Sequence, residues 1–528
     1  MIAVLFTIIS VTAINCWQMV LENFDYDCSF SLAAAKNLAE GNGYTIKMAS
    51  PSDLSTVYYE PLNKWPPGYS LLLMLVWKLT GTGWIQAAYI LNAIALTALV
   101  LVFRSILLQL EYPSWIVHPI VLFFGFIPHA FLSRWFSDMM GVLFFMLGFS
   151  LLLYFVKRKR KTVWPVLLAA FLFSFCAFLK YLYLGLAVVP ILCLFWYGCR
   201  IHHKQIIRSA VAGFIVVLMG ISLLLIYQFQ HSGKAMYINE SASGFFPEQL
   251  LLTGPLIPAS FLNLNFYSLQ ISLHAQLTYE KMMQVWSVIN LLCMAGLLFT
   301  AWKWFREKRF IQKDYRSFYA MLAAVFSLSL MAFLGFLSVT QSKNYPRHSA
   351  WTYVQEMRYF GVFSVLLIQW LGYLYLSAQN FFGKMGSVIF RFLMVIILIM
   401  DVFHGTYFLF KKVVVEKSTG LQRPSEQIDL TALALTRKEM LKNQTVIVCS
   451  NLQEILNICG LAGAAGINDL SVLNKPLRTS RPIVLLTVMN TRYPVADQSF
   501  LSSTSTVLEK DFSGVYYYIT RIPKSPPF

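Results

Sequence analysis

The stretch of sequence that decides the fold runs from residue 22 to residue 69 and reads ENFDYDCSFSLAAAKNLAEGNGYTIKMASPSDLSTVYYEPLNKWPPGY. It is polar, and it follows an apolar segment over residues 2–20. Asp25 and Asp27 come directly after that segment ends. A short amphipathic helix is predicted over residues 28–40, where glycines stop it, and a second helix begins behind a Pro-Pro pair at 66–67. Carboxylates at the end of an apolar segment, backed by a structured loop, indicate chemistry at a membrane surface.

Composition places the chain in a membrane. Of its 528 residues 57% are hydrophobic and only 12% are charged, whereas soluble domains carry about 25% charged residues. Several apolar runs are long enough to cross a hydrocarbon core of about 30 Å, and their continuity predicts helices. The net charge of +18 does not indicate nucleic acid, because the basic residues cluster in short connections between spans. We predict an all-α polytopic membrane protein with a small C-terminal α/β soluble domain.

Charge sets the predicted topology. About eleven spans are expected, near residues 2–20, 84–109, 114–131, 138–156, 163–180, 182–198, 207–228, 283–303, 317–339, 358–378 and 386–410. The basic run 157–161 and the basic stretch 303–316 should be cytoplasmic, which puts the amino terminus inside and the C-terminal domain outside. The apolar residues 69–80 are too short for a span and are predicted to form a helix on the outer surface. We expect the plasma membrane of a bacterium, because the chain shows no targeting motif and has compact loops.

Two domains are predicted. Residues 1–412 form a transmembrane domain, with a first outer loop over 22–83 that carries surface helices and a second over 229–282 that also holds one. Residues 415–528 form a soluble α/β domain on the outer face, with strands near 445–450, 482–488 and 515–520 and helices near 431–442 and 452–459. The eight cysteines show no metal-binding spacing, and Cys449 could pair with Cys459 in an oxidising compartment.

On this topology the unusual ionisable residues lie at the outer ends of spans, where charged groups by default indicate a site. They are Asp25, Asp27, Glu60, Lys64, Arg134, Asp138, Lys180, Arg347 and Arg358, with Tyr359 beside the last. Each has a structural alternative. Asp27 and Asp138 could cap helices, whereas Arg134, Lys180 and Arg358 could reach lipid head groups. Glu60 and Lys64 could be a solvated pair on a loop.

The order of motifs in the first outer loop is specific. Asp27 is followed by Ala-Lys-Asn-Leu-Ala-Glu-Gly-Asn-Gly-Tyr at 35–44 and by Trp-Pro-Pro-Gly-Tyr at 65–69. This order resembles the first outer loop of GT-C type membrane glycosyltransferases. The branch is the family 39-like one, with the protein mannosyltransferases and the aminoarabinose transferase acting on lipid A. Ser137-Asp138 at the head of a span and Arg358-Tyr359 late in the membrane region are similar as well. The resemblance covers about residues 1–410, although the acids here are split as Asp-Tyr-Asp and Trp65 stands between Lys64 and the prolines.

The resemblance implies that a sugar passes from a polyprenyl-phosphate donor to a lipid, glycan or protein acceptor on the outer face. Asp27 would be the general base, with Asp25 in reserve, because the acceptor hydroxyl must lose a proton as it attacks. The leaving phosphate needs cationic partners, for which Arg358, Lys180, Arg134, Lys64 and Arg347 are available, with Tyr359 beside them. Asp138 and Glu60 would position sugar or acceptor. No nucleotide is required, and a divalent metal between Asp27 and Glu60 stays open.

Other functions use a similar number of spans. A transporter or flippase of lipid-linked sugars would need no general base and would favour repeats with broken helices at the midplane, for which the sequence gives no sign. A polysaccharide polymerase or ligase usually relies on a large outer loop late in the chain, and 229–282 is the longest apart from the tail. A non-catalytic relative would bind the lipid-linked sugar without turnover.

Overall fold

The computed structural model describes residues 1–20, 26–126, 136–158, 162–236, 245, 256–262, 279–306, 314–340, 357–411, 424–469, 471, 478–489, 505–506 and 516–525. The chain divides into two compact units. The helical unit comprises residues 1–21, 92–229 and 235–415, and the mixed unit comprises residues 22–91, 230–234 and 416–528. Each is described by itself.

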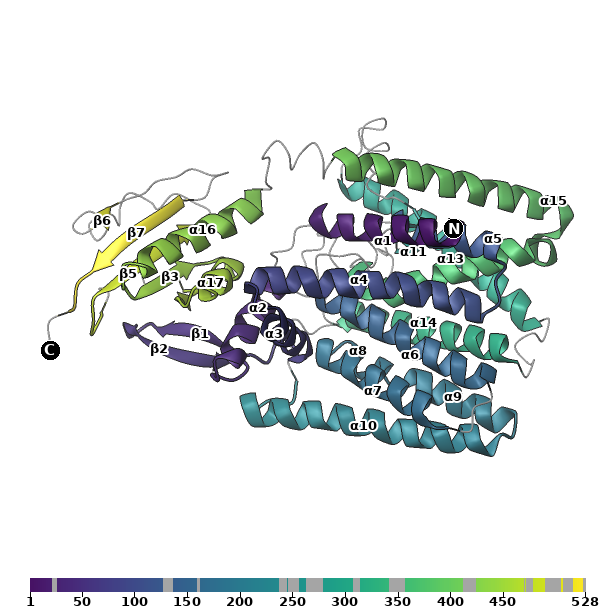
Figure 1. The fold of residues 1–528 in the computed structure, drawn as a ribbon, viewed down its shortest axis with the longest axis horizontal. Coiled ribbons are helices and arrows are strands. Elements are labelled where there is room, and N and C mark those ends of the chain that lie inside the picture. The colour runs from purple at the N-terminus through teal and green to yellow at the C-terminus, as the bar shows by residue number, and fades with distance from the viewer. Residues whose placement is uncertain are drawn as a thin grey trace. The chain divides into compact units, whose positions relative to one another are not determined.

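Long apolar helices dominate the chain, as composition predicted (Figure 1). Within the described residues, seven helical stretches are long and apolar enough to cross a membrane. They are α4 (Trp84–Gln109), α6 (Phe136–Arg158), α8 and α9 together (Tyr183–Leu186 and Val189–Arg200), α10 (Lys204–Ser232), α13 (Tyr279–Arg306), α14 (Tyr315–Thr340) and α15 (Gly361–Leu409). The shorter apolar helices of the helical unit include α1 (Ile2–Val20), α5 (Ser114–Phe126) and α7 (Trp164–Leu179). A membrane protein is confirmed, and the count of eleven spans stays a prediction.

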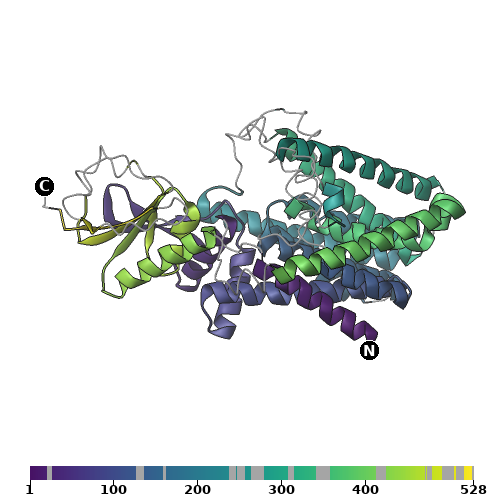
Figure 2. The same ribbon diagram turned by 90° about the horizontal axis from the view of Figure 1, so that it is seen from above.

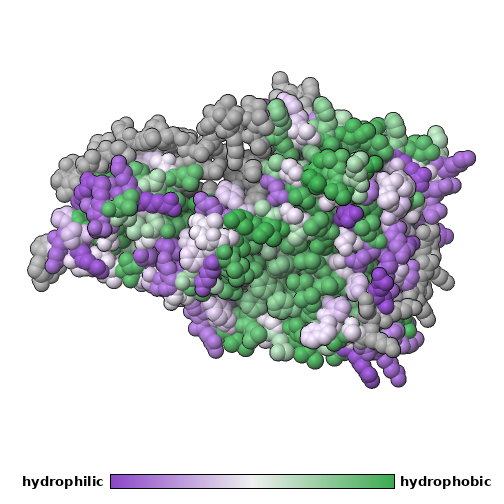
Figure 3. Space-filling view, in the orientation of Figure 1, coloured by the Kyte–Doolittle hydropathy of each residue, from purple (hydrophilic) through white to green (hydrophobic). Residues whose placement is uncertain are grey.

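The surface of the helical unit suits lipid. Figure 3 shows hydrophobic residues gathered over the helices on the face in view. Large apolar side chains of the helical unit, such as Leu223, Leu292 and Phe392, are exposed rather than buried. Exposed apolar surface of this extent is typical of a membrane-facing or binding surface. In the interior α6 packs on α7, α1 on α5, and α14 on α9.

Helix α15 contains a reversal of the chain. At Gly383 the backbone has φ 73°, which favours glycine. The Arg391 guanidinium donates to the carbonyl oxygens of Tyr375 and Leu376, at 3.0 and 3.3 Å. Sixteen residues of straight helix would span about 24 Å, beyond the reach of an arginine, so the two halves of α15 fold back on each other. They correspond to the predicted spans 358–378 and 386–410.

The mixed unit is built on a seven-stranded sheet of order β2-β1-β4-β3-β5-β7-β6. Its strands are β1 (Thr45–Ser50), β2 (Asp53–Pro61), β3 (Val446–Ser450), β4 (Ala465–Ile467), β5 (Ile483–Met489), β6 (Ser505–Thr506) and β7 (Tyr516–Ile522). β1 and β2 form an antiparallel hairpin, and β1, β4, β3 and β5 are parallel neighbours. β7 pairs antiparallel with both β5 and β6. The strands predicted in the tail are confirmed as β3, β5 and β7.

This sheet changes the domain division that the sequence suggested. The first outer loop, which we expected to belong with the membrane helices as surface helices, supplies two strands to the sheet of the C-terminal domain. The join is the parallel pairing of β1 with β4, where Met48 faces Gly466. Local sequence patterns cannot reveal it, because the partners lie more than 400 residues apart.

Helices cover one face of the sheet. α16 (Pro424–Met440) and α17 (Gln453–Gly460) match the predicted helices, and α16 lies along the strands in Figure 1 and, seen from above, in Figure 2. Val446 and Val448 of β3 pack with these helices, whereas Cys449 belongs to the core on the opposite face, because successive side chains of a strand point to opposite faces. Cys459 lies with the helices on the other face, so the two buried cysteines form no disulfide with each other, and the predicted pairing is wrong.

Two further helices of the mixed unit follow the predictions for the first loop. α2 (Tyr26–Ala39) packs on the hairpin through Phe30 and Ala34. α3 (Gly68–Thr80) begins behind Pro67 and is tied to α2 by Ser70 Oγ, which donates to the carbonyl of Ser31 at 2.9 Å. The last turn of α10 also belongs to this unit, where His231 Nε2 hydrogen-bonds the carbonyl of Tyr44 at 2.6 Å.

The second outer loop, 229–282, has one short helix among its described residues. This helix, α11 (Leu256–Ala259), is buried in the helical unit, whereas we expected a helix on the surface. Hydrogen bonds to neighbouring helices allow this short helix to be buried. The backbone N–H of Ile257 donates to Asn290 Oδ1 at 2.7 Å, and Ser260 Oγ bonds Ser364 Oγ at 2.8 Å. The first of these bonds satisfies a backbone N–H that a buried helix end would otherwise leave without a partner, and the second joins the helix to α15.

Candidate active site

Three of the predicted site residues come together in the helical unit. Asp138 lies in the first turn of α6, Lys180 ends α7, and Tyr359 lies in the 3-10 helix η4 (Met357–Phe360). Lys180 Nζ contacts Asp138 Oδ1 at 2.5 Å and sits 4.3 Å from the centre of the Tyr359 ring. The sequence predicted this convergence from topology alone, since the three residues belong to separated segments on one predicted face.

The local backbone explains how Lys180 reaches this place. Residue 180 is extended, with φ −159° and ψ 133°, and it interrupts the chain between α7 and α8. Because the helix ends at this residue, the side chain can turn toward α6, which packs against α7. The result is an ammonium held at the end of two packed helices.

The pair is nearly dry. The Asp138 side chain is 2% exposed and the Lys180 side chain 13% exposed. Among the described residues, Asp138 Oδ2 is buried and has no hydrogen-bond partner, which is costly for a carboxylate oxygen. The arrangement thus offers a desolvated ammonium that can attract an anion and a carboxylate oxygen that can accept a hydrogen bond from a hydroxyl. The Tyr359 ring favours a cation over its face.

Tightly packed aromatic rings lie beside the pair. Tyr183 packs so closely against α6 that a Cβ on Gly141 would overlap its ring. Phe145 contacts Tyr183 edge-on and stacks on Phe173, and all of these rings are fully or almost fully buried. This filled interior keeps the site desolvated from within. Neither Gly141 nor Tyr183 was among the residues that we predicted for the site. A glycine inside an apolar helix one turn after Asp138 was the available signal.

Asp27 belongs to the mixed unit. It is half-buried in the first turn of α2, which begins one residue earlier at Tyr26. Asp27 is the acidic residue of the first turn of this helix. The positive end of the helix dipole favours the ionised carboxylate at this place.

Lys64 and Glu60 lie on the same unit. The Lys64 ammonium sits 4.8 Å from the centre of the Trp65 ring, and Trp65 stacks on Phe30 of α2 at 4.5 Å between ring centres. The tryptophan that separates Lys64 from the two prolines therefore links Lys64 to the helix that carries Asp27. Glu60 is exposed on β2, opposite Ile46.

Several predicted site residues lie outside this description. Asp25, Arg134 and Arg347 fall outside the described residues, and Arg358 is described only by its backbone in η4. The described part of the chain brings together no group of three or more His, Cys, Asp or Glu residues that could hold a metal ion. A metal between Asp27 and Glu60 stays a prediction.

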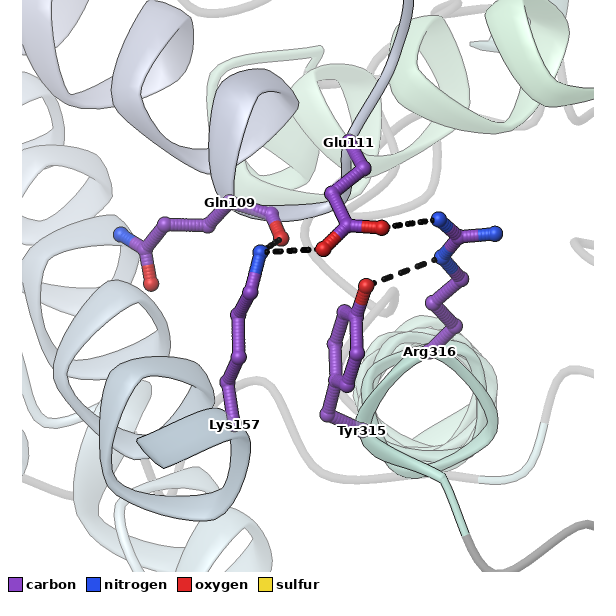
Figure 4. Close-up of polar contacts among 5 residues, drawn as sticks. All are labelled: Gln109, Glu111, Lys157, Tyr315 and Arg316. Atoms are coloured by element: carbon purple, nitrogen blue, oxygen red, sulfur yellow. Dashed lines mark hydrogen bonds and ion pairs between the residues drawn. The ribbon is translucent and has the colours of Figure 1, made fainter. Parts of the chain in front are cut away.

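A second polar cluster, which we did not predict as a site, joins three helical connections (Figure 4). Glu111, between α4 and α5, pairs with Lys157 of α6 at 2.9 Å and with Arg316 of α14 at 2.6 Å. Hydrogen bonds from Lys157, Tyr315 and Arg316 lower the pKa of the Glu111 carboxyl to about 2. The predicted topology puts all three connections on one side of the membrane, and the cluster confirms that they share one end of the helical unit.

Comparison with solved structures finds similar folds, among them two structures of one protein that match over nearly the whole chain. The structure of ArnT from Cupriavidus metallidurans in the apo state has a TM-score of 0.52, and the same protein bound to undecaprenyl phosphate has 0.51. In both, sequence identity is 13% and the match covers 99% of each chain. By sequence, no protein-family model and no curated protein matches. This chain therefore shares its fold with ArnT, which agrees with the fold that the motifs of its first outer loop predicted.

Proposed function

We propose that the chain is an integral-membrane glycosyltransferase. It transfers a sugar from a polyprenyl-phosphate donor to an acceptor hydroxyl on the outer face of a bacterial plasma membrane. The observation that carries the proposal is the desolvated Lys180 ammonium, held between Asp138 and Tyr359 in a membrane fold shared with a protein that binds undecaprenyl phosphate.

Lys180 is the proposed contact to the donor phosphate. Its ammonium donates to Asp138 Oδ1, and an ammonium can also bind a phosphate oxygen through a charged hydrogen bond. Low exposure strengthens its attraction for an anion, because little water screens the charge. Arg358 belongs to the same 3-10 helix as Tyr359 and is proposed as a second phosphate contact, with Arg134, Arg347 and Lys64 as further cations.

Asp138 has a proposed double role. Its Oδ1 holds Lys180 in place, and its buried Oδ2, which has no partner among the described residues, accepts a hydrogen bond from a sugar hydroxyl. Binding the donor would then remove the cost of an unsatisfied buried oxygen. Glu60, exposed on its strand, is proposed to contact the acceptor.

Asp27 is the proposed general base. Its carboxylate takes the proton of the acceptor hydroxyl while the acceptor oxygen bonds to the anomeric carbon of the sugar. The bond from that carbon to the phosphate oxygen breaks, and the polyprenyl phosphate leaves with the bonding electrons. Lys180 and its neighbouring cations stabilise the negative charge that develops on the leaving phosphate. The configuration at the anomeric carbon is inverted.

The test compares envelope lipids and glycans by mass spectrometry in a strain that lacks the gene. The strain is complemented with wild type, with Asp27→Asn, or with Asp25→Asn, which tests the reserve candidate for the base. We expect one sugar modification to vanish on deletion and to return with wild type and with Asp25→Asn, but not with Asp27→Asn. General-base loss should lower the rate by about 10²–10⁴-fold. Full restoration by Asp27→Asn would rule out Asp27 as the base. If the lipid-linked sugar accumulates on the inner leaflet instead, the transport alternative replaces this proposal.

A further inference from the structure

The C-terminal segment contacts the helix that carries Asp27 at a buried polar point. Asn457 of α17 is 1% exposed and Ser29 of α2 is fully buried. Asn457 Nδ2 donates to Ser29 Oγ at 3.1 Å, across 428 residues of sequence. Both residues belong to the mixed unit, and Ser29 stands only two residues after Asp27.

Two lysines of the first loop bind the backbone of the segment just after Asn457. Lys36, near the end of α2, donates to the carbonyl of Gly460 at 3.0 Å, and Lys47 of β1 donates to the carbonyl of Gly463 at 2.6 Å. These carbonyls lie at the C-terminal end of α17 and in the turn after it, where cations are favoured. Burial, followed by the charge of Lys36, lowers the pKa of the Lys47 ammonium.

The tip of the hairpin is attached as well. Asp53 Oδ1 accepts hydrogen bonds from the Ser55 hydroxyl and from the backbone N–H of Ser480, at 2.7 and 3.2 Å. The bonds made by Ser29, Lys36, Lys47 and Asp53, together with the pairing of β1 with β4, link the first loop to the C-terminal segment at five points.

The contacts also set the rotation of α2 about its own axis. Each residue of an α-helix turns by about 100°, so Asp27 and Ser29 differ by about 200°. Burying Ser29 against α17 therefore places Asp27 on the opposite side of the helix from Ser29, where it is half-buried. A helix of 14 residues is marginal by itself in water, so this orientation depends on what α2 packs against.

We infer that the C-terminal segment is the scaffold of the catalytic loop, and that Asn457 is a positioning residue that acts through Ser29 to orient Asp27. This inference rests on the proposed function, in which Asp27 is the base. It gives the tail, in whose sequence we find no catalytic motif, a role in transfer.

The experiment uses the full-length protein in detergent with three readouts. They are the transfer rate, the binding of undecaprenyl phosphate, and hydrogen exchange of the amides of α2. The variants are Ser29→Ala, which is close to isosteric, Asn457→Leu, and the exposed control Asn451→Ala. Loss of the bond should speed exchange over residues 28–38 about fivefold. Misplacing the base should slow transfer about 10- to 100-fold, while undecaprenyl phosphate binding and the control stay within twofold of wild type.

Two combined variants separate positioning from general damage. In an Asp27→Asn background, Asn457→Leu should cause no further loss of residual transfer, because the group that it orients is already gone. Ser29→Ala with Asn457→Leu should be no worse than either alone, since removing both partners leaves no unsatisfied buried group. Ser29→Thr, which keeps the hydroxyl, should recover most of the rate lost in Ser29→Ala.

The results that would contradict the positioning role of Asn457 differ from those that would contradict the role of Asp27 as the base. Unchanged exchange in α2, unchanged transfer in Asn457→Leu, or an equal loss of undecaprenyl phosphate binding would each overturn the positioning role. Wild-type transfer by Asp27→Asn would instead overturn the proposed base. The exchange measurement would then still decide whether the C-terminal segment holds α2.

Discussion

The buried pair of Asp138 and Lys180 allows a stability effect to be separated from a binding effect. At 2.5 Å between Nζ and Oδ1 and an effective dielectric constant of about 20, the attraction is about 7 kcal/mol. Desolvation of the two ions costs several kcal/mol each and offsets much of it. The net stabilisation by the pair is therefore small. Removing one partner leaves the other charge buried and should cost about 3–5 kcal/mol of unfolding free energy.

We expect Asp138→Asn and Lys180→Met to be strongly destabilised singly, and the double variant to be close to wild type in stability, because no buried charge remains. The assay is denaturant titration of the full-length protein in detergent, which gives the free energy of unfolding of each variant. The surface control is Glu40→Gln, which breaks the pair of Lys36 with a 48% exposed Glu40 and should cost less than about 1 kcal/mol.

In these variants, binding of undecaprenyl phosphate should not change in parallel with the free energy of unfolding. If Lys180 contacts the donor phosphate, the double variant regains stability but still binds undecaprenyl phosphate more weakly than wild type. The affinity should fall about 10- to 100-fold, which is the effect expected from losing one charged hydrogen bond. A double variant that binds and transfers like wild type would refute the reasoning, since the pair would then serve folding alone. Additive destabilisation in the double variant would refute the claim that the two charges are coupled.

Three further predictions concern other parts of the chain. The pKa of Glu111 lies at about 2, below its ordinary 4.5, so its stabilisation is present at neutral pH and lost on acidification. The deficit of Glu111→Gln in thermal stability should therefore narrow as the pH falls from about 4.5 towards 2, and also in 1 M salt. Gly141→Ala should destabilise by about 1–3 kcal/mol in denaturant titration because its Cβ overlaps the Tyr183 ring, whereas Gly296→Ala, with open space around it, should not. Cys199, exposed at the end of α9, should react with a membrane-impermeant maleimide in inverted vesicles but not in intact cells. Labelling in intact cells would show that the predicted orientation in the membrane is wrong.

Much of the fold could be read from the sequence because membranes impose strong local rules. A span needs a long apolar run, and cytoplasmic loops are enriched in basic residues. Most spans and the break between 378 and 386 were therefore predictable. The same rules placed Asp138, Lys180 and Tyr359 on one face, and the structure joins them. The tail strands were predictable from their β-branched and aromatic runs.

The candidate site was only partly predictable. Charge and topology identified which residues could meet, but not that Lys180 pairs with Asp138 or that Tyr183 packs beside them against Gly141. Such contacts depend on which faces of α6 and α7 touch. In helices that are apolar on every side, the hydrophobic pattern does not distinguish these faces.

The sequence by itself determined the class of the protein, its apolar helices and the loop that carries Asp27. Only the tertiary structure decided what supports that loop. The β1–β2 hairpin completes the sheet of the tail through the parallel pairing of β1 with β4, and Asn457 holds Ser29. The physical reason is distance along the chain. A periodic pattern reports the local backbone conformation and which side is buried, whereas a parallel strand pair and a single buried hydrogen bond between residues more than 400 apart leave no local pattern from which the partner could be inferred.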